Sequence, residues 1–218
     1  MSFQTQAAVL VPERPALRGI SHMIAVLAAT AGAVWLLLIA DSPTGYVSGA
    51  VFGTSLILLY SASTAYHRFA WKTFLERTFK RVDHAMIFVL IAGTYTPFCL
   101  NVSLAWGIPI LAVVWSLAGA GTLIKLVWLD SPRWVSVSLY IGLGWVGLVS
   151  VSEVFGWYAA SPLTLLAIGG ALYTLGGIVY ATRRPDPFPR IFGFHEVFHA
   201  LVVGGSVAHY VAIAFFVL

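Results

Sequence analysis

The chain of 218 residues contains very little charge and almost no cysteine. Only 9% of its residues are Asp, Glu, Lys or Arg, whereas ordinary soluble proteins contain about 25%. This shortage excludes a disordered chain and a soluble nucleic-acid-binding protein. The single cysteine, Cys99, cannot form an internal disulfide, so a disulfide-rich secreted scaffold is excluded as well. What remains is an apolar chain in which 60% of the residues are hydrophobic.

Seven long apolar runs follow one another along the chain, separated by short polar turns. A membrane-spanning helix needs about 20 apolar residues, so seven such helices use about 140 residues. We therefore predict an all-α integral membrane protein, a single seven-transmembrane helix bundle over residues 1–218 with no second domain. The predicted spans cover about residues 19–40, 46–67, 82–100, 104–126, 135–155, 163–181 and 195–218.

The basic residues occupy alternate loops only. All twelve lysines and arginines fall in the N-terminal segment or in and beside the second, fourth and sixth loops. The other loops and the C-terminus have none. Because cytoplasmic loops of membrane proteins carry an excess of Lys and Arg, the pattern predicts a cytoplasmic N-terminus and a C-terminus outside.

A few ionisable residues lie inside the spans, where each is costly without a partner and is therefore a candidate site residue. His67 ends the second span at its cytoplasmic side, and Asp83 begins the third span there. His195 and His199 begin the seventh span at the same side, four residues apart, so both imidazoles face one direction. Ser63 has the same spacing from His67 on the second span. Candidate ligands and bases from three helices thus fall at a similar depth in the same leaflet.

Three neutral imidazoles and one water form a common catalytic zinc site with an open position. We therefore predict that His67, His195 and His199 bind Zn2+. Asp83 is either a fourth ligand or the group that holds the water and accepts its proton. Ser63 is a second candidate catalytic residue, predicted to hydrogen-bond the Asp83 carboxylate or the oxyanion.

The remaining polar residues of the spans favour other interpretations. Thr94 follows Asp83 by eleven residues, about three helical turns, so the two lie on nearly the same face. Thr94 and Tyr95 are candidates to line an acyl cavity above the zinc, and ordinary interhelical hydrogen bonding is the alternative. Three further histidines are expected only to hydrogen-bond between helices: His22, His84 and His209.

The histidine pair also allows two rival interpretations. The residues from His195 to His199 match H-E-x-x-H, the pattern of zinc proteases in which the glutamate is the general base. Such enzymes use a distant acidic third ligand, and the nearest candidate, Asp130, lies in a cytoplasmic loop. Glu196 is also about 100° around the helix from His195, so it faces the metal only if the helix end is distorted. A bis-histidine haem is disfavoured because no second helix offers histidines paired at two depths.

Three motifs stand in order along the chain: Ser63-x-x-x-His67, Asp83-His84-x-x-Ile87-Phe88 and His195-Glu196-Val197-Phe198-His199. In these motifs the chain resembles, over essentially its whole length, the haemolysin III family. That family is the bacterial branch of the progestin and adipoQ receptor family, which includes the adiponectin receptors. The resemblance implies a seven-helix bundle in the bacterial plasma (inner) membrane and a zinc held by the three matching histidines. It also implies that Asp83 binds the zinc water rather than the metal directly.

The resemblance also implies an activity. Relatives are associated with zinc-dependent hydrolysis of lipid amides, which implies an intramembrane hydrolase of lipid amides or esters that acts in membrane-lipid homeostasis. Its expected partners are membrane lipids and no nucleic acid. One alternative is a lipid-responsive receptor or regulator with a structural zinc and no turnover. Another is a pore-forming haemolysin, which is disfavoured because the spans are too apolar to line a wide aqueous channel.

Overall fold

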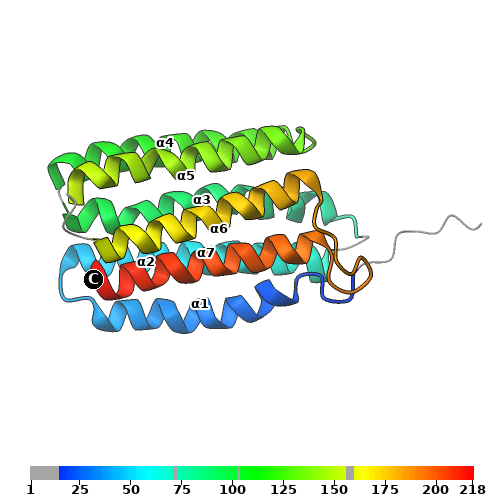
Figure 1. Ribbon diagram of the computed structural model, residues 1–218, viewed down its shortest axis with the longest axis horizontal. Coiled ribbons are helices and arrows are strands. Elements are labelled where there is room, and N and C mark those ends of the chain that lie inside the picture. Colours follow the sequence, from blue (N-terminus) through cyan, green and yellow to red (C-terminus); the bar gives the residue numbers. More distant parts are fainter. Residues whose placement is uncertain (1–14, 71–72, 103, 156–159) are drawn as a thin grey trace, which may run out of the picture.

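The chain folds into seven long α-helices that run back and forth along one axis (Figure 1). The computed structural model describes residues 15–70, 73–102, 104–155 and 160–218, with the backbone only for residues 102, 147–155 and 160. The helices within these ranges are α1 (Ile20–Ile39), α2 (Pro43–Thr64), α3 (Glu76–Val102), α4 (Leu104–Val127), α5 (Arg133–Phe155), α6 (Ala160–Thr182) and α7 (Phe194–Phe216). The prediction of an all-α fold is therefore confirmed.

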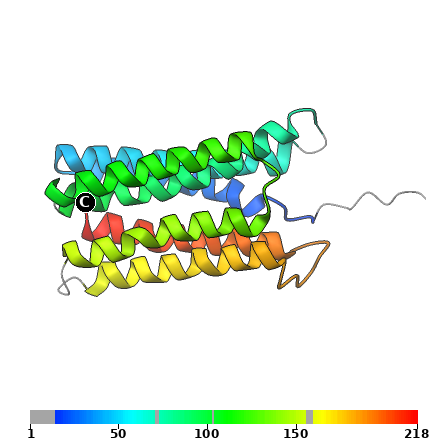
Figure 2. The same ribbon diagram turned by 90° about the horizontal axis from the view of Figure 1, so that it is seen from above.

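Among the described residues, six of these helices are long and apolar enough to cross a membrane: α1, α2, α3, α4, α6 and α7. The protein is thus a multi-pass membrane protein. The remaining predicted span, residues 135–155, corresponds to α5, part of which is described by its backbone only. The start of α1 and the C-terminus lie at opposite ends of the bundle (Figure 1, Figure 2).

The helices differ in how much of their surface the bundle covers. In the most apolar stretch of each helix, 56% of the residues are buried in α2 and in α3, and 50% in α7. The corresponding share is 22% in α1 and α4 and 28% in α6. Helix α4 packs on α3, and α5 packs on α6, so α2, α3 and α7 form the centre of the bundle (Figure 1). The outer helices expose apolar surface, as a helix in contact with lipid requires.

The last turn of α2 is wider than an α-helical turn. Residues Ala65–Phe69 form a π-helical turn, η1, closed by a 2.9 Å hydrogen bond from the Ala70 N–H to the Ala65 carbonyl. Such turns take in one more residue than an α-helical turn and are frequent at functional sites. The sequence predicted a regular α-helix through His67, so the structure changes the direction in which His67 leaves the helix axis.

The other predicted span limits lie close to the observed helix ends, with one exception. Helix α3 begins at Glu76, well before the predicted start near Val82. The prediction followed the apolar run, whereas a helix continues beyond the apolar run for as long as its backbone hydrogen bonds do. The polar first turns of α3 therefore extend the helix beyond the end of its apolar stretch.

Candidate metal centre and lipid cavity

Three imidazoles from two parts of the chain converge at the end of the bundle where α1 begins. His67 comes from the π-helical turn, and His195 and His199 come from the first turns of α7. One nitrogen of each ring lies within 4.8 Å of the nitrogens of the other two. The Nε2 atoms of His67 and His195 are 3.1 Å apart. The structure thus brings together the three residues that the sequence proposed as ligands.

The three rings suit a metal ion in both chemistry and spacing. Neutral imidazole is the commonest metal ligand in proteins, and two nitrogens on one tetrahedral zinc ion are about 3.3 Å apart. The 3.1 Å between His67 and His195 is close to that separation. The Nδ1 atom of His199 is buried and has no hydrogen-bond partner among the described residues. The three histidines therefore form a possible metal site.

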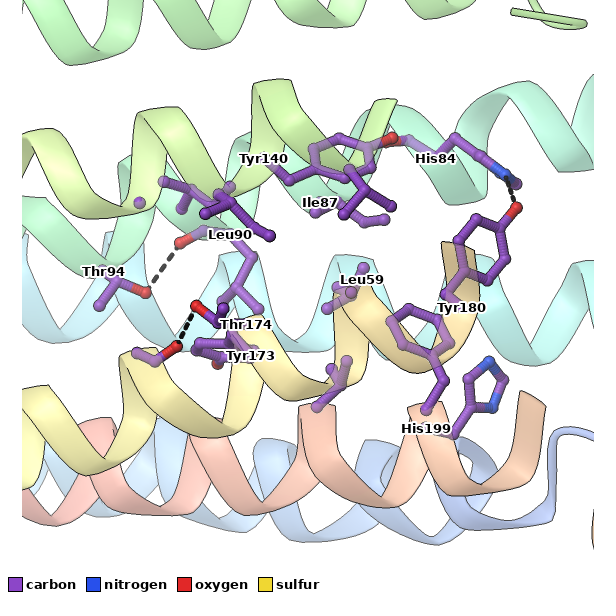
Figure 3. Close-up of a pocket in the computed structure, with 18 of the residues that line it drawn as sticks. Leu59, His84, Ile87, Leu90, Thr94, Tyr140, Tyr173, Thr174, Tyr180 and His199 are labelled. Atoms are coloured by element: carbon purple, nitrogen blue, oxygen red, sulfur yellow. Dashed lines mark hydrogen bonds between the residues drawn. The ribbon is translucent and has the colours of Figure 1, made fainter. Parts of the chain in front are cut away.

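Asp83 lies beside this site and not within it. Its ligand atoms are not among those that converge in the described part of the chain, although its buried side chain lines the same cavity as His195 and His199. Its Oδ2 atom is 3.4 Å from His84 Nδ1. The Nε2 atom of His84 lies 3.3 Å from the Tyr180 hydroxyl of α6 (Figure 3). His84 therefore links α3 to α6, as predicted.

Ser63 is paired with a histidine that the sequence placed outside the site. Its Oγ atom is 2.8 Å from Nδ1 of His22, in the first turn of α1, and it forms no hydrogen bond to Asp83 among the described residues. The His22 ring is also stacked on His199, with 3.7 Å between the ring centres and 9° between the planes. The sequence predicted the interhelical bond but missed the stacking. His22 begins the first span at the cytoplasmic side, so its depth in the membrane matches that of His67 and was the sequence signal for this contact.

Both carboxylate oxygens of Glu196 bind groups at the start of α7. Its Oε2 atom accepts a 2.8 Å hydrogen bond from the Gly193 N–H, and its Oε1 atom forms a short ion pair with Nε of Arg18. Both oxygens of this buried carboxylate therefore have partners at the helix end. Asp130, the alternative third ligand of a protease, forms an exposed ion pair with Arg77 at 2.8 Å. The glutamate of the H-E-x-x-H pattern therefore caps α7, while its two histidines belong to the possible metal site.

A largely apolar cavity of about 150 Å³ adjoins the metal site through His195 and His199 (Figure 3). This volume is many times the ~10–15 Å³ that one water needs. The polar residues near the metal site are His22, Ser63, Asp83, His84, Tyr180, His195 and His199. Apolar residues of α2, α3, α5 and α7 line the middle. The cavity reaches Thr94, which is about 16 Å along α3 from Asp83, or about half the thickness of a bilayer core.

Thr94 and Tyr95 lie at the far end of this cavity. Both line it, and both are hydrogen-bonded to backbone carbonyls. The Thr94 hydroxyl donates to the Leu90 carbonyl over 2.8 Å, and the Tyr95 hydroxyl lies 2.8 Å from the carbonyls of Leu143 and Gly144. Tyr95 therefore both lines the cavity and bonds α3 to α5, whereas Thr94 lines the cavity and bonds its own helix.

Comparison with known proteins places this architecture in a family. The model of the family described as "Haemolysin-III related" matches residues 11–210. The hemolysin-3 homolog of Bacillus subtilis is 34% identical over 201 residues, which cover 90% of this chain and 91% of that protein. Hemolysin-3 of Bacillus cereus is 31% identical over 205 residues, 91% of this chain and 90% of that protein.

A more distant similarity extends to the receptors that the motifs resemble. The adiponectin receptor protein of Drosophila melanogaster is 28% identical over 182 residues, which cover 75% of this chain and 41% of that receptor. The match is confined to less than half of the receptor, whereas the two Bacillus proteins match over nearly their whole length. From the motifs, the helical bundle and the extent of these matches, we conclude that the chain belongs to the haemolysin-III-related family.

Proposed function

We propose that this protein is a zinc-dependent hydrolase of lipid amides or esters that works within the bacterial inner membrane. The observation that carries the proposal is the meeting of three histidines and a buried carboxylate at one end of an apolar cavity. The proposed topology has seven crossings and a cytoplasmic N-terminus. The connections rich in Lys and Arg lie at the histidine end of the bundle, which supports this orientation (Figure 1).

The histidines, Asp83 and His84 each have a separate role in the proposed reaction. His67, His195 and His199 hold the ion; when bound by three imidazoles, zinc supplies an open coordination position and activates water near neutral pH. Asp83 stands outside the three ligands, so its carboxylate is available to accept a proton from the attacking water. His84, 3.4 Å from Oδ2, orients that carboxylate.

The shape of the cavity supports a substrate with an acyl chain. Its length of about 16 Å is close to the hydrocarbon thickness of one leaflet. The hydroxyls of Thr94 and Thr174 donate to backbone carbonyls over 2.8 Å and so present little polarity to an occupant. A lipid whose carbonyl lies near the histidines extends its chain along these walls. Membrane lipids with an acyl amide or ester are therefore the proposed substrate class.

The proposal is tested with purified protein and a panel of lipid amides and esters in mixed micelles, with released fatty acid measured by mass spectrometry. We expect release from at least one lipid, loss of release after treatment with a metal chelator, and recovery when Zn2+ is added back. The same chelated sample incubated with Mg2+ is the matched control and should stay inactive, because Mg2+ prefers oxygen ligands.

One observation favours a second function. The three imidazoles join the end of α2 to the start of α7, so a metal held by them ties two central helices together. A lipid-responsive regulator with a structural zinc uses the same contacts without turnover. Zinc bound at one ion per chain with no fatty acid released from any lipid of the panel would reject the hydrolase and support this regulator.

A further inference from the structure

We propose that His22 is a positioning residue of the metal centre, which holds the ring of His199 in the orientation that its ligand nitrogen needs. Ser63 in turn holds His22. This inference rests on the proposed function only in that the three histidines bind a metal ion. It adds α1 to the helices that determine the geometry of the site.

The contact between His22 and His199 is a flat one between two buried rings. Their centres are 3.7 Å apart and their planes differ by 9°, and the side chains are 3% and 1% exposed. Tyr60 of α2 packs edge-on against His22, with 5.0 Å between the ring centres. Because His22 is held between Tyr60 and His199, the His199 ring cannot turn about its Cβ–Cγ bond without a clash with His22. The stack therefore restricts the rotation of the His199 imidazole.

The same geometry excludes His22 as a further ligand of the same ion. An imidazole nitrogen binds a metal with a lone pair that lies in the plane of its own ring. Because the two rings are stacked and nearly parallel, an ion in the plane of His199 lies well outside the plane of His22. His22 is also not among the described residues whose ligand atoms converge. It supports a ligand and does not replace one.

The first turn of α1 is fixed in place by independent contacts on both sides. Gly19 has a positive φ of 76°, and a Cβ atom there would come within 2.8 Å of His67 Cβ. Its neighbour Arg18 is paired with Glu196 of α7. The Ala16 N–H donates to the Arg190 carbonyl over 3.0 Å. The turn that carries His22 is therefore held against both segments that carry the three ligands.

The hydrogen bond to Ser63 fixes how the His22 ring is rotated within the stack. Ser63 is 1% exposed and its hydroxyl lies 2.8 Å from His22 Nδ1, so the bond defines how the ring is turned within the stack. The Nε2 atom of His22 is buried and has no hydrogen-bond partner among the described residues. The His22 ring is thus fixed by one hydrogen bond and by the rings packed against it. Substitutions of Ser63 and His22 should both change zinc affinity through the orientation of His199, so their effects should not be additive.

The test measures zinc affinity of the purified full-length protein by competition with a chromophoric chelator, together with the absorption spectrum of the Co2+ form. His22→Ala should bind zinc roughly 10–100-fold more weakly, the range found for residues that support metal ligands. His22→Phe keeps a flat ring and should recover affinity to within a few-fold of the unsubstituted protein. Ser63→Ala should give a smaller, several-fold loss. His209→Ala, a buried histidine on the same helix as His199, is the control and should not change affinity.

The Co2+ spectrum separates a positioning role from ligation. In His22→Ala the bands should shift while the number of nitrogen ligands stays the same. Unchanged zinc affinity in His22→Ala, or in Ser63→Ala if the first variant does not fold, overturns the inference. A spectrum with one nitrogen fewer would make His22 a ligand and overturn it too. If His199→Ala binds zinc as well as the unsubstituted protein, the metal site of the proposed function fails.

Discussion

The two ends of the cavity contain similar polar residues whose hydrogen bonds are satisfied in different ways. At the far end, the Thr94 hydroxyl donates to the Leu90 carbonyl over 2.8 Å, and His209 Nε2 lies 3.2 Å from the Leu166 carbonyl. At the histidine end, His67 and His22 instead face side chains from other helices. The three imidazoles of the metal centre converge on one another, and His22 is stacked on the His199 ring.

This difference shows that the role of a polar residue inside the membrane follows from the group that it binds, and not simply from its occurrence in a span. A hydroxyl or imidazole bonded to a backbone carbonyl is already satisfied and contributes to helix packing. Imidazoles whose nitrogens converge on one point form a set of ligand atoms, which suits a cation. We therefore propose that the histidine end carries out the hydrolysis and that the far end binds the acyl chain. Each variant below tests that division.

The largest effect is expected from removing one of the converging histidines. His199→Ala should weaken zinc binding by more than ~100-fold, since even a residue that only supports a ligand is worth 10–100-fold, and fatty-acid release should disappear. His209→Ala should keep one zinc per chain, because its ring bonds the backbone of α6. Metal content measured by mass spectrometry after desalting compares the two. Equal zinc loss in both variants would contradict the division between the two ends.

The next largest effect concerns Asp83 and its counterpart on the same helix face. Asp83→Asn removes the proton acceptor and should lower kcat by about 10²–10⁴-fold, the usual contribution of a general base, while zinc stays bound. Thr94→Val removes a hydroxyl that is already bonded to the backbone of its own helix, so kcat should change by only a few-fold. Loss of zinc in Asp83→Asn would instead identify Asp83 as a ligand.

A third effect tests whether the cavity holds the acyl chain. A Cβ atom at Gly142 or Gly144 would meet no atom within 4 Å, but of the two only Gly144 lines the cavity. Gly144→Leu should therefore raise KM for long-chain substrates roughly 10–100-fold, at about 0.8 kcal/mol for each methylene that loses its burial. Short-chain substrates and zinc content should be unaffected.

Gly142→Leu is the matched control, since it adds the same side chain to the same helix outside the cavity. Steady-state kinetics over a series of acyl-chain lengths make the comparison. An equal rise in KM in both variants, or a rise that does not depend on chain length, would argue against an acyl chain in this cavity.

The smallest effect is expected at Glu196. Glu196→Gln loses the charge that pairs with Arg18 but keeps an oxygen for the Gly193 N–H. The free energy of unfolding should fall by about 1.5–3 kcal/mol, as for a hydrogen bond to a charged group, and kcat should hardly change. Denaturant unfolding and the fatty-acid assay measure both quantities. A folded variant without turnover would restore a catalytic role for this glutamate.

Much of the site could be predicted because depth in a membrane can be read along the chain. The positions of the basic residues gave each span a direction, and direction placed His67, His195 and His199 at one level. Their convergence in the structure agrees with that placement. The four-residue spacing of the pair on α7 also predicted that both rings face the same way.

The partners of individual side chains were harder to predict. Ser63 was expected to hydrogen-bond the Asp83 carboxylate or the oxyanion, and its hydroxyl lies against His22. Helix α1 packs against both α2 and α7, which brings His22 to Ser63, and the π-helical turn at Ala65–Phe69 separately changes the direction of His67. Neither the order of the helices around the bundle nor the widening of one turn leaves a pattern in hydropathy or charge.

Apolar length, helical spacing and loop charge were thus enough to predict the helices and the level at which the histidines lie, because these properties belong to single segments and to the membrane that surrounds them. The lateral arrangement of the helices decided which ring stacks on which, that Glu196 pairs with Arg18, and where the cavity opens between them. That arrangement depends on close packing between distant segments, in which the fit of each side chain is determined by several neighbours at once.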